Sequence, residues 1–131
     1  MAAPTARVFN LSTGQVLARE AVFATTFWSR FKGLMGKKRL DQGMDGLILL
    51  PCRGVHSFFM SMEIDVLFVG IGGEIVHIAH SLPKWSASRV VREAHYVVEL
   101  PAGRAKQTGT WVGQRILLEQ PEKTPGARQR R

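Results

Sequence analysis

The feature that most constrains the fold of this chain is the alternation of residue types between Phe58 and Val69. If this stretch is extended, one face carries only apolar side chains, namely Phe58, Met60, Met62, Ile64, Val66 and Phe68. The other face is more polar and includes Glu63 and Asp65. Because successive side chains of a strand point to opposite faces, this period of two predicts a β-strand whose apolar face belongs to the core.

A glycine pair follows this stretch and predicts a tight hairpin. Gly72 and Gly73 can adopt the positive φ angles that short hairpin turns require, and the next strand is expected from Glu74 to His80. A second hairpin is expected within residues 6–22, around the turn signal at residues 12–14.

Other segments predict further strands and two short helices. The aliphatic run 46–51 has the length of a strand buried on both faces, and 94–100 and 111–119 also have strand character. Apolar residues at helical spacing in 27–35 predict an amphipathic helix, and a helical turn is expected near 104–108.

The length of 131 residues is that of one ordinary domain. We expect residues 1–120 to form it and residues 121–131 to be a disordered basic tail, because that tail is polar and has little to bury. No apolar run approaches the roughly 20 residues that span a bilayer, and the start of the chain lacks a secretory signal pattern. We therefore expect a cytoplasmic protein without membrane contact, and its single cysteine, Cys52, fits a reducing compartment.

The formal net charge is +8, and part of it lies in one run that contains no acidic residue. The basic residues of this run are Arg30, Lys32, Lys37, Lys38 and Arg39. Such a run attracts phosphate groups, so nucleic-acid association is one interpretation. The alternative is a solvated helix face and loop, which the absence of a recognised nucleic-acid motif favours.

Several short motifs occur in an order that resembles a known family. They are Arg30 with Gly33-Leu34-Met35, the aliphatic run ending near Pro51, Phe58-Phe59-Met60, Ile64-Asp65, the glycine hairpin and Glu99-Leu100-Pro101-Ala102-Gly103. Over residues 6–119 the chain is similar to domain-of-unknown-function family 192 of bacteria and archaea. Residues 59 and 61–63 depart from the commonest pattern of that family, and the chain looks more like the branch with an upstream cysteine and histidine, here Cys52 and His56.

The resemblance implies an α+β domain that is mainly β. We expect a compact antiparallel barrel-like or half-barrel domain of about seven or eight strands with one or two short helices. The family has no settled reaction, so the resemblance implies no activity.

The candidate ligand-binding residues gather around segment 52–65. They are Cys52, His56, Phe59, Met60 and Asp65, with Arg30 as a further candidate. A bend at Gly54 would bring Cys52 and His56 together, and an imidazole within hydrogen-bond reach activates a thiol. Together with Met60 they would also be a soft ligand set suited to copper(I). The alternative is structural, with Cys52 as a small buried residue and His56 as a hydrogen-bonded residue at the end of a strand.

Asp65 also has two interpretations. A carboxylate beside an aliphatic run needs a partner, for which Arg30, His56 or a backbone N–H is expected, and such a pair would fix the start of the strand. The functional alternative is a polar anchor in a ligand pocket walled by Phe59, Met60 and Trp85.

No motif assigns a reaction to the chain. The sequence has no Ser-His-Asp order, phosphate-binding loop, dinucleotide fingerprint, CxxC pair or HExxH helix, so we assign no catalytic residue, metal or cofactor. The leading hypothesis is a non-enzymatic binding or accessory domain for a small molecule or an extended peptide, held near Cys52 to Asp65. The alternatives are a nucleic-acid-associating protein that uses the basic run and a thiol-dependent enzyme that uses Cys52 and His56. The sequence predicts no oligomeric state.

Overall fold

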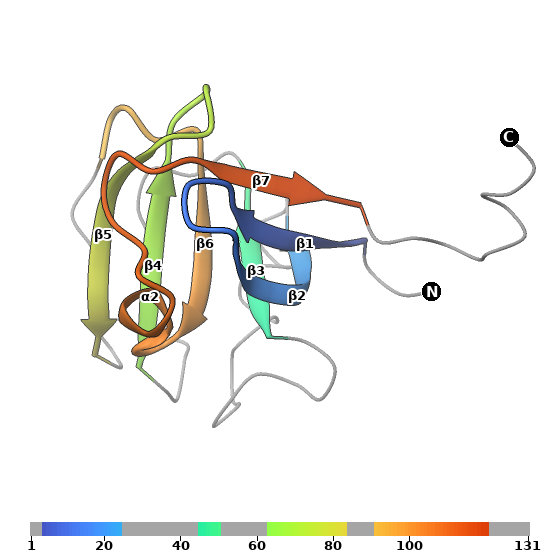
Figure 1. Ribbon diagram of the computed structural model, residues 1–131, viewed down its shortest axis with the longest axis horizontal. Helices are drawn as coiled ribbons and strands as arrows, with labels where there is room; N and C mark the ends of the chain where they lie inside the picture. Colours follow the sequence, from blue (N-terminus) through green and yellow to red (C-terminus); the bar gives the residue numbers. More distant parts are fainter. Residues whose placement is uncertain (1–3, 25–44, 51–62, 84–90, 121–131) are drawn as a thin grey trace, which may run out of the picture.

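The computed structural model describes residues 4–24, 45–50, 63–83 and 91–120 (Figure 1). These residues form a single, mainly-β domain with one short helix. Its elements are β1 (Thr5–Asn10), β2 (Gln15–Ala24), β3 (Gly46–Leu49), β4 (Ile64–Val69), β5 (Ile75–Leu82), β6 (Tyr96–Pro101), α2 (Arg104–Gln107) and β7 (Ile116–Glu119).

The strands form one mixed seven-stranded sheet in the order β5-β4-β6-β3-β2-β1-β7. Neighbouring strands are antiparallel except β2 and β3, which run parallel with Val22 beside Leu47. The sheet is therefore mostly antiparallel, as expected, with one parallel pair that the sequence analysis did not predict. A parallel pair needs a chain segment that returns to the starting end of the sheet, and local turn signals do not report such a crossover.

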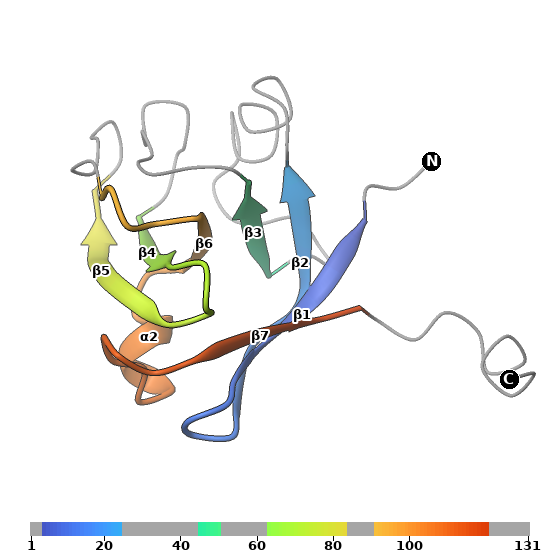
Figure 2. The ribbon, with the colours of Figure 1, turned by 90° about the horizontal axis from the view of Figure 1, so that it is seen from above.

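The sheet curls into a half-barrel, and the start of β5 is joined to the segment before β7. The Ile75 N–H donates to the Gln114 carbonyl at 2.8 Å, and the Gly113 N–H donates to the Ile75 carbonyl at 2.8 Å. The Ile116 N–H completes the contact by donating to the Gly73 carbonyl at 2.8 Å. Figure 2 shows the chain running from beside β5 through β7 and along β1.

Buried apolar side chains lie on both faces of the sheet. The first cluster joins β1, β2, β7 and α2 to the central strands and includes Val8, Leu17, Leu67 and Ala105. The second cluster lies on the opposite face and includes Phe68. All six residues of β4 are buried, so the face that carries Asp65 is as buried as the apolar face expected from the alternation.

Both predicted hairpins are confirmed, and the strand expected in the aliphatic run 46–51 is found as β3 (Gly46–Leu49), which is buried on both faces. In the second hairpin turn Gly73 has a φ of 91°, whereas Gly72 is not in the left-handed region. The predicted helix in 27–35 and the predicted tail in 121–131 lie outside the described residues.

Candidate functional site

The carboxylate of Asp65 is fully buried and accepts three backbone hydrogen bonds. Its Oδ1 accepts from the Ser81 N–H at 2.8 Å. Its Oδ2 accepts from the N–H groups of Gly103 at 3.1 Å and Ala105 at 2.9 Å. Since Asp65 has an exposed fraction of 0%, these bonds compensate the loss of water around the carboxylate.

A β-bulge in β5 brings the first of these N–H groups to Asp65. The register between β4 and β5 shifts between the pairs Ile64 with Leu82 and Val66 with Ala79, so two β5 residues face Asp65. One of them, Ser81, has a φ of 49°, which is uncommon for a residue other than glycine. The hydrogen bond from the Ser81 N–H to Asp65 helps to hold this conformation.

The other two N–H groups belong to the start of α2. Gly103 precedes the helix with a φ of 92°, in the left-handed region that glycine adopts without steric cost. Asp65 therefore connects the start of β4 to the turn that leads from β6 into α2. A backbone N–H was one of the partners expected for this carboxylate, and the geometry supports its structural interpretation.

Arg104, the first residue of α2, reaches back to β2. Its Nε donates to the Leu17 carbonyl at 3.0 Å, and its Nη2 donates to the Val16 carbonyl at 3.1 Å. A guanidinium has five N–H donors, so these two bonds leave three for other acceptors.

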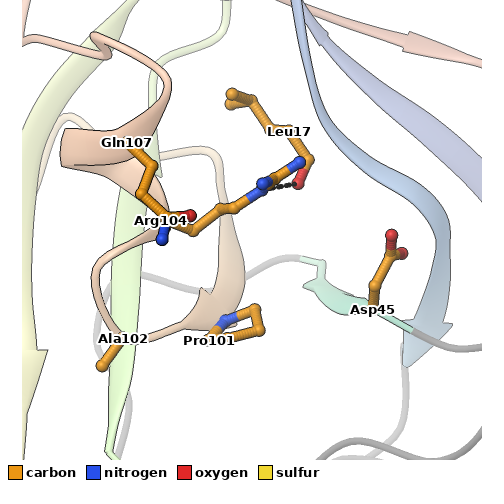
Figure 3. Close-up of a pocket in the computed structure, with 6 residues that line it drawn as sticks. All are labelled: Leu17, Asp45, Pro101, Ala102, Arg104 and Gln107. Atoms are coloured by element: carbon orange, nitrogen blue, oxygen red, sulfur yellow. Dashed lines mark hydrogen bonds between the residues drawn. The ribbon is translucent and has the colours of Figure 1, made fainter.

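A pocket of about 380 Å³ opens beside Arg104, and we call it the Arg104 pocket. Its lining residues are Leu17, Asp45, Pro101, Ala102, Arg104 and Gln107 (Figure 3). The figure shows Arg104 extending from α2 towards Leu17, and Asp45 lying apart from it beside β2 and β3. The Arg104 pocket therefore presents a cationic and an anionic side chain at separate positions.

The backbone of β2 fixes the carboxylate of Asp45. The Asp45 Oδ2 accepts from the backbone N–H of Arg19 at 2.8 Å, and the Asp45 Oδ1 accepts from the backbone N–H of Glu20 at 2.9 Å. Each oxygen keeps a second lone pair for another donor. Both charged groups of the pocket are thus held in place by backbone hydrogen bonds.

Five of the six predicted ligand-binding residues lie outside the described part of the chain. They are Arg30, Cys52, His56, Phe59 and Met60. Their convergence with Asp65 stays a prediction. Among residues 4–24, 45–50, 63–83 and 91–120, no three His, Cys, Asp or Glu side chains are grouped to hold a metal ion.

The sequence interpretation missed three polar residues that the structure makes prominent. Glu99 is only 3% exposed in the middle of β6. The sequence pattern that could have identified it is a charged residue inside the apolar run 97–100. Asp45 and Arg104 line the Arg104 pocket, but they are far apart in the sequence and no local pattern connects them.

Burial also raises the pKa of the Tyr96 side chain. Tyr96, at the start of β6, is 8% exposed, and loss of water around its phenol raises its pKa to about 12. No helix in the described part of the chain is long and apolar enough to cross a membrane.

Comparison with solved structures finds this fold in two bacterial proteins. A protein of unknown function from Novosphingobium aromaticivorans superposes with a TM-score of 0.71 at 21% identity, over 86% of this chain and 83% of that one. A protein from Sinorhizobium meliloti 1021, described as a proposed transcription regulator, superposes with a TM-score of 0.65 at 24% identity, over 88% and 92%.

Sequence comparison finds archaeal relatives. A UPF0127 protein of Pyrococcus furiosus is 32% identical over 83% of this chain and 95% of its own length. A UPF0127 protein of Thermococcus sibiricus is 28% identical over 86% of this chain and 74% of its own length. The model of the DUF192 family, described as an uncharacterized ACR, matches residues 8–118. The chain therefore belongs to the DUF192 family, whose relatives carry the name UPF0127.

Proposed function

We propose that this protein is a cytoplasmic, non-enzymatic binding domain, and that the Arg104 pocket takes a small molecule or peptide segment with one anionic and one cationic group. The observation that carries the proposal is the placement of Arg104 and Asp45 at separate positions in the lining of one open pocket. A ligand of matching charge would satisfy both side chains at once.

The hydrogen-bonding capacity of the two residues supports this ligand class. Arg104 keeps three N–H donors after its bonds to Val16 and Leu17, and a carboxylate or phosphate is a strong acceptor for them. Asp45 keeps lone pairs that can accept from an ammonium or an amide. Because the backbone already holds both side chains, a ligand loses little affinity in ordering them.

Asp65 contributes to this pocket indirectly. Its bonds to the N–H groups of Gly103 and Ala105 fix the residues on either side of Arg104. Asp65 is thus a positioning residue for the wall of the pocket, which gives this predicted candidate a role without ligand contact.

A ligand screen tests the proposal. We would follow the melting temperature of the full chain with free amino acids and short peptides, and then measure the Kd of each hit by calorimetry. Arg104→Lys keeps the positive charge but loses the planar guanidinium, which can donate two parallel hydrogen bonds to one anionic group. Asp45→Asn removes the negative charge. Each change should weaken binding by about tenfold.

Exposed residues outside the pocket provide matched controls. Arg92→Lys and Glu63→Gln make the same chemical changes at exposed positions and should leave the Kd unchanged. Hits that bind equally well to both pocket variants would place the site elsewhere, and a screen without hits would contradict the proposed ligand class.

Nucleic-acid association is the second candidate function. The net charge of +8 supports it, and one protein of the same fold is described as a proposed transcription regulator. Affinity for single- or double-stranded oligonucleotides should be highest at low salt and fall steeply as salt is added, because phosphate contacts release counterions. Absence of binding at low salt would remove this candidate.

We also propose that the chain belongs to the cysteine- and histidine-carrying branch of its family, which Cys52 and His56 support. If these side chains pair as thiol and imidazole, alkylation of Cys52 by iodoacetamide should report a thiol pKa well below the ordinary value of about 8.5. A titration at the ordinary value would exclude the thiol-dependent enzyme.

A further inference from the structure

A second pocket lies on the side of α2 that Lys106 occupies. It has a volume of about 240 Å³ and is lined by His80, Lys106, Gly109, Thr110 and Trp111. These residues come from β5, α2 and the loop after α2. Neither the family match nor the Arg104 pocket assigns a role to them.

Trp111 is the unusual member of this lining. The residue is 68% exposed, although tryptophan gains more than most residues from burial. The backbone N–H of Trp111 donates to the Gln114 Oε1 at 2.8 Å, and the backbone N–H of Gln114 donates back to the Trp111 carbonyl at 3.2 Å. A two-way contact of this kind defines the backbone of the turn that carries the indole.

A buried polar network holds this turn against β1. Asn10 is fully buried, and its Nδ2 donates to the Thr110 Oγ1 at 3.2 Å and to the Gln114 Oε1 at 2.9 Å. The hydroxyl groups of Thr108 and Thr110 are 2.8 Å apart and share a further hydrogen bond. These hydrogen bonds hold the backbone that carries the exposed indole, and an exposed aromatic side chain at a well-held position is typical of a binding surface.

The charge of the lining indicates which ligands fit. Lys106 and His80 are both exposed and can donate hydrogen bonds, and none of the five lining residues is acidic. A planar ring of a ligand can stack on the indole face of Trp111, and an anionic group of the ligand can bind the ammonium group of Lys106.

We propose that this pocket, which we call the Trp111 pocket, binds a small molecule that has a planar ring and an anionic group. The ring stacks on the indole of Trp111, and the anionic group accepts hydrogen bonds from Lys106 and His80. This site is separate from the Arg104 pocket and does not rest on the function proposed for it.

The test is an NMR titration of the full chain, labelled with ¹⁵N, that follows the indole Nε1–H signal of Trp111. Trp111→Phe identifies that signal among those of the three tryptophans. The probes are adenosine monophosphate and indole-3-carboxylate, which combine a ring with phosphate or carboxylate. Adenosine alone and inorganic phosphate alone serve as half-ligands.

We expect saturable shifts with at least one of the two complete probes, and the probe that binds identifies the source of the anionic group. Each half-ligand should bind about tenfold more weakly or not at all. Trp111→Ala should weaken binding by about tenfold or more, since stacking on an aromatic ring dominates such sites. Lys106→Gln should weaken it by about two- to fivefold, as expected for an exposed charge pair.

Arg92→Gln is the control, because it removes one exposed positive charge just before the start of β6, whereas α2 follows the end of that strand. It should leave the affinity unchanged. The proposal is overturned if neither complete probe shifts the Trp111 signal, if a half-ligand binds as tightly as a complete probe, or if Arg92→Gln weakens binding as much as Lys106→Gln does.

Discussion

At Asp65 one carboxylate connects three parts of the chain that are far apart in sequence. It belongs to β4, and its partners are Ser81 in β5 and the backbone of Gly103 and Ala105 around the start of α2. The sequence identified Asp65 as unusual because it stands beside an aliphatic run, and it offered a backbone N–H as one of three partners. Which N–H groups these are depends on a bulge and a turn that residue patterns do not specify.

Replacing Asp65 should lower the free energy of unfolding. Asp65→Ala leaves three backbone N–H groups without their acceptor, and we expect a loss of about 3–5 kcal/mol. Asp65→Asn keeps one acceptor oxygen, so its loss should be smaller, about 1–3 kcal/mol. Urea denaturation measures both, with the exposed neighbour Glu63→Gln as a control that should change little. A wild-type stability in Asp65→Ala would contradict the role assigned to the carboxylate.

The phenol of Tyr96 gives a second prediction at the residue scale. Tyr96 is the only tyrosine, so tyrosinate absorbance reports it alone. The folded protein should titrate with a pKa of about 12, while the denatured chain should titrate near 10.

The sign of the effect on stability follows from these two pKa values. Above pH 10 the unfolded chain loses the proton that the folded state still holds, so the free energy of unfolding falls as pH rises from about 10 to 12. Below pH 10 this residue contributes no pH dependence. Tyr96→Phe should remove the part of the decline that is due to this residue, and an unchanged slope in that variant would assign the decline to other groups.

At the scale of elements, α2 is a single turn of helix whose position is set by its neighbours. Asp65 holds its start, Arg104 ties it to β2, and Ala105 is buried in the first cluster. The sequence predicted a helical turn near residues 104–108, and the structure confirms it. The two pockets beside α2 could not be predicted, because their walls come from segments that only the sheet topology brings together.

Gly103 provides the test of this element. A Cβ at this position would meet no atom within 4 Å, so the cost of a side chain comes from the backbone φ of 92°. Gly103→Ala should destabilise the protein by about 1–2 kcal/mol, and Gly103→Asn should cost less, because asparagine tolerates the left-handed region better than alanine does. Thermal denaturation of the two variants measures the difference. Equal losses in both would mean that the left-handed backbone is not the cause.

At the scale of the molecule, the seven-stranded sheet curls into a half-barrel, and backbone hydrogen bonds join the start of β5 to the segment that leads into β7. All seven strands were expected from alternation, turn residues and apolar runs, although β7 begins only at Ile116 within the expected segment 111–119, and the family resemblance predicted the half-barrel. The parallel pairing of β2 with β3 could not be predicted from these sequence patterns, because the register of the two strands depends on contacts across the whole sheet.

Truncation tests this view of the molecule. Removing residues 121–131, which the sequence predicts to be a disordered tail, should change the free energy of unfolding by no more than about 0.5 kcal/mol. Removing residues 116–131 also deletes β7, exposes the edge of β1 and breaks the bond from Ile116 to Gly73, so it should unfold or severely destabilise the protein. Urea denaturation of both truncated chains measures this, and equal stability would contradict the closing role of β7.

The central claim is that Asp65 anchors α2 as a shared wall of the two pockets, and amide hydrogen exchange tests it most directly. The N–H groups of Ser81, Gly103 and Ala105 should exchange slowly in the wild-type protein, because each donates to the buried carboxylate. In Asp65→Ala these three should lose protection by more than the change in global stability explains, while Glu63→Gln should retain it. Rapid exchange of all three amides in the wild-type protein would contradict the claim.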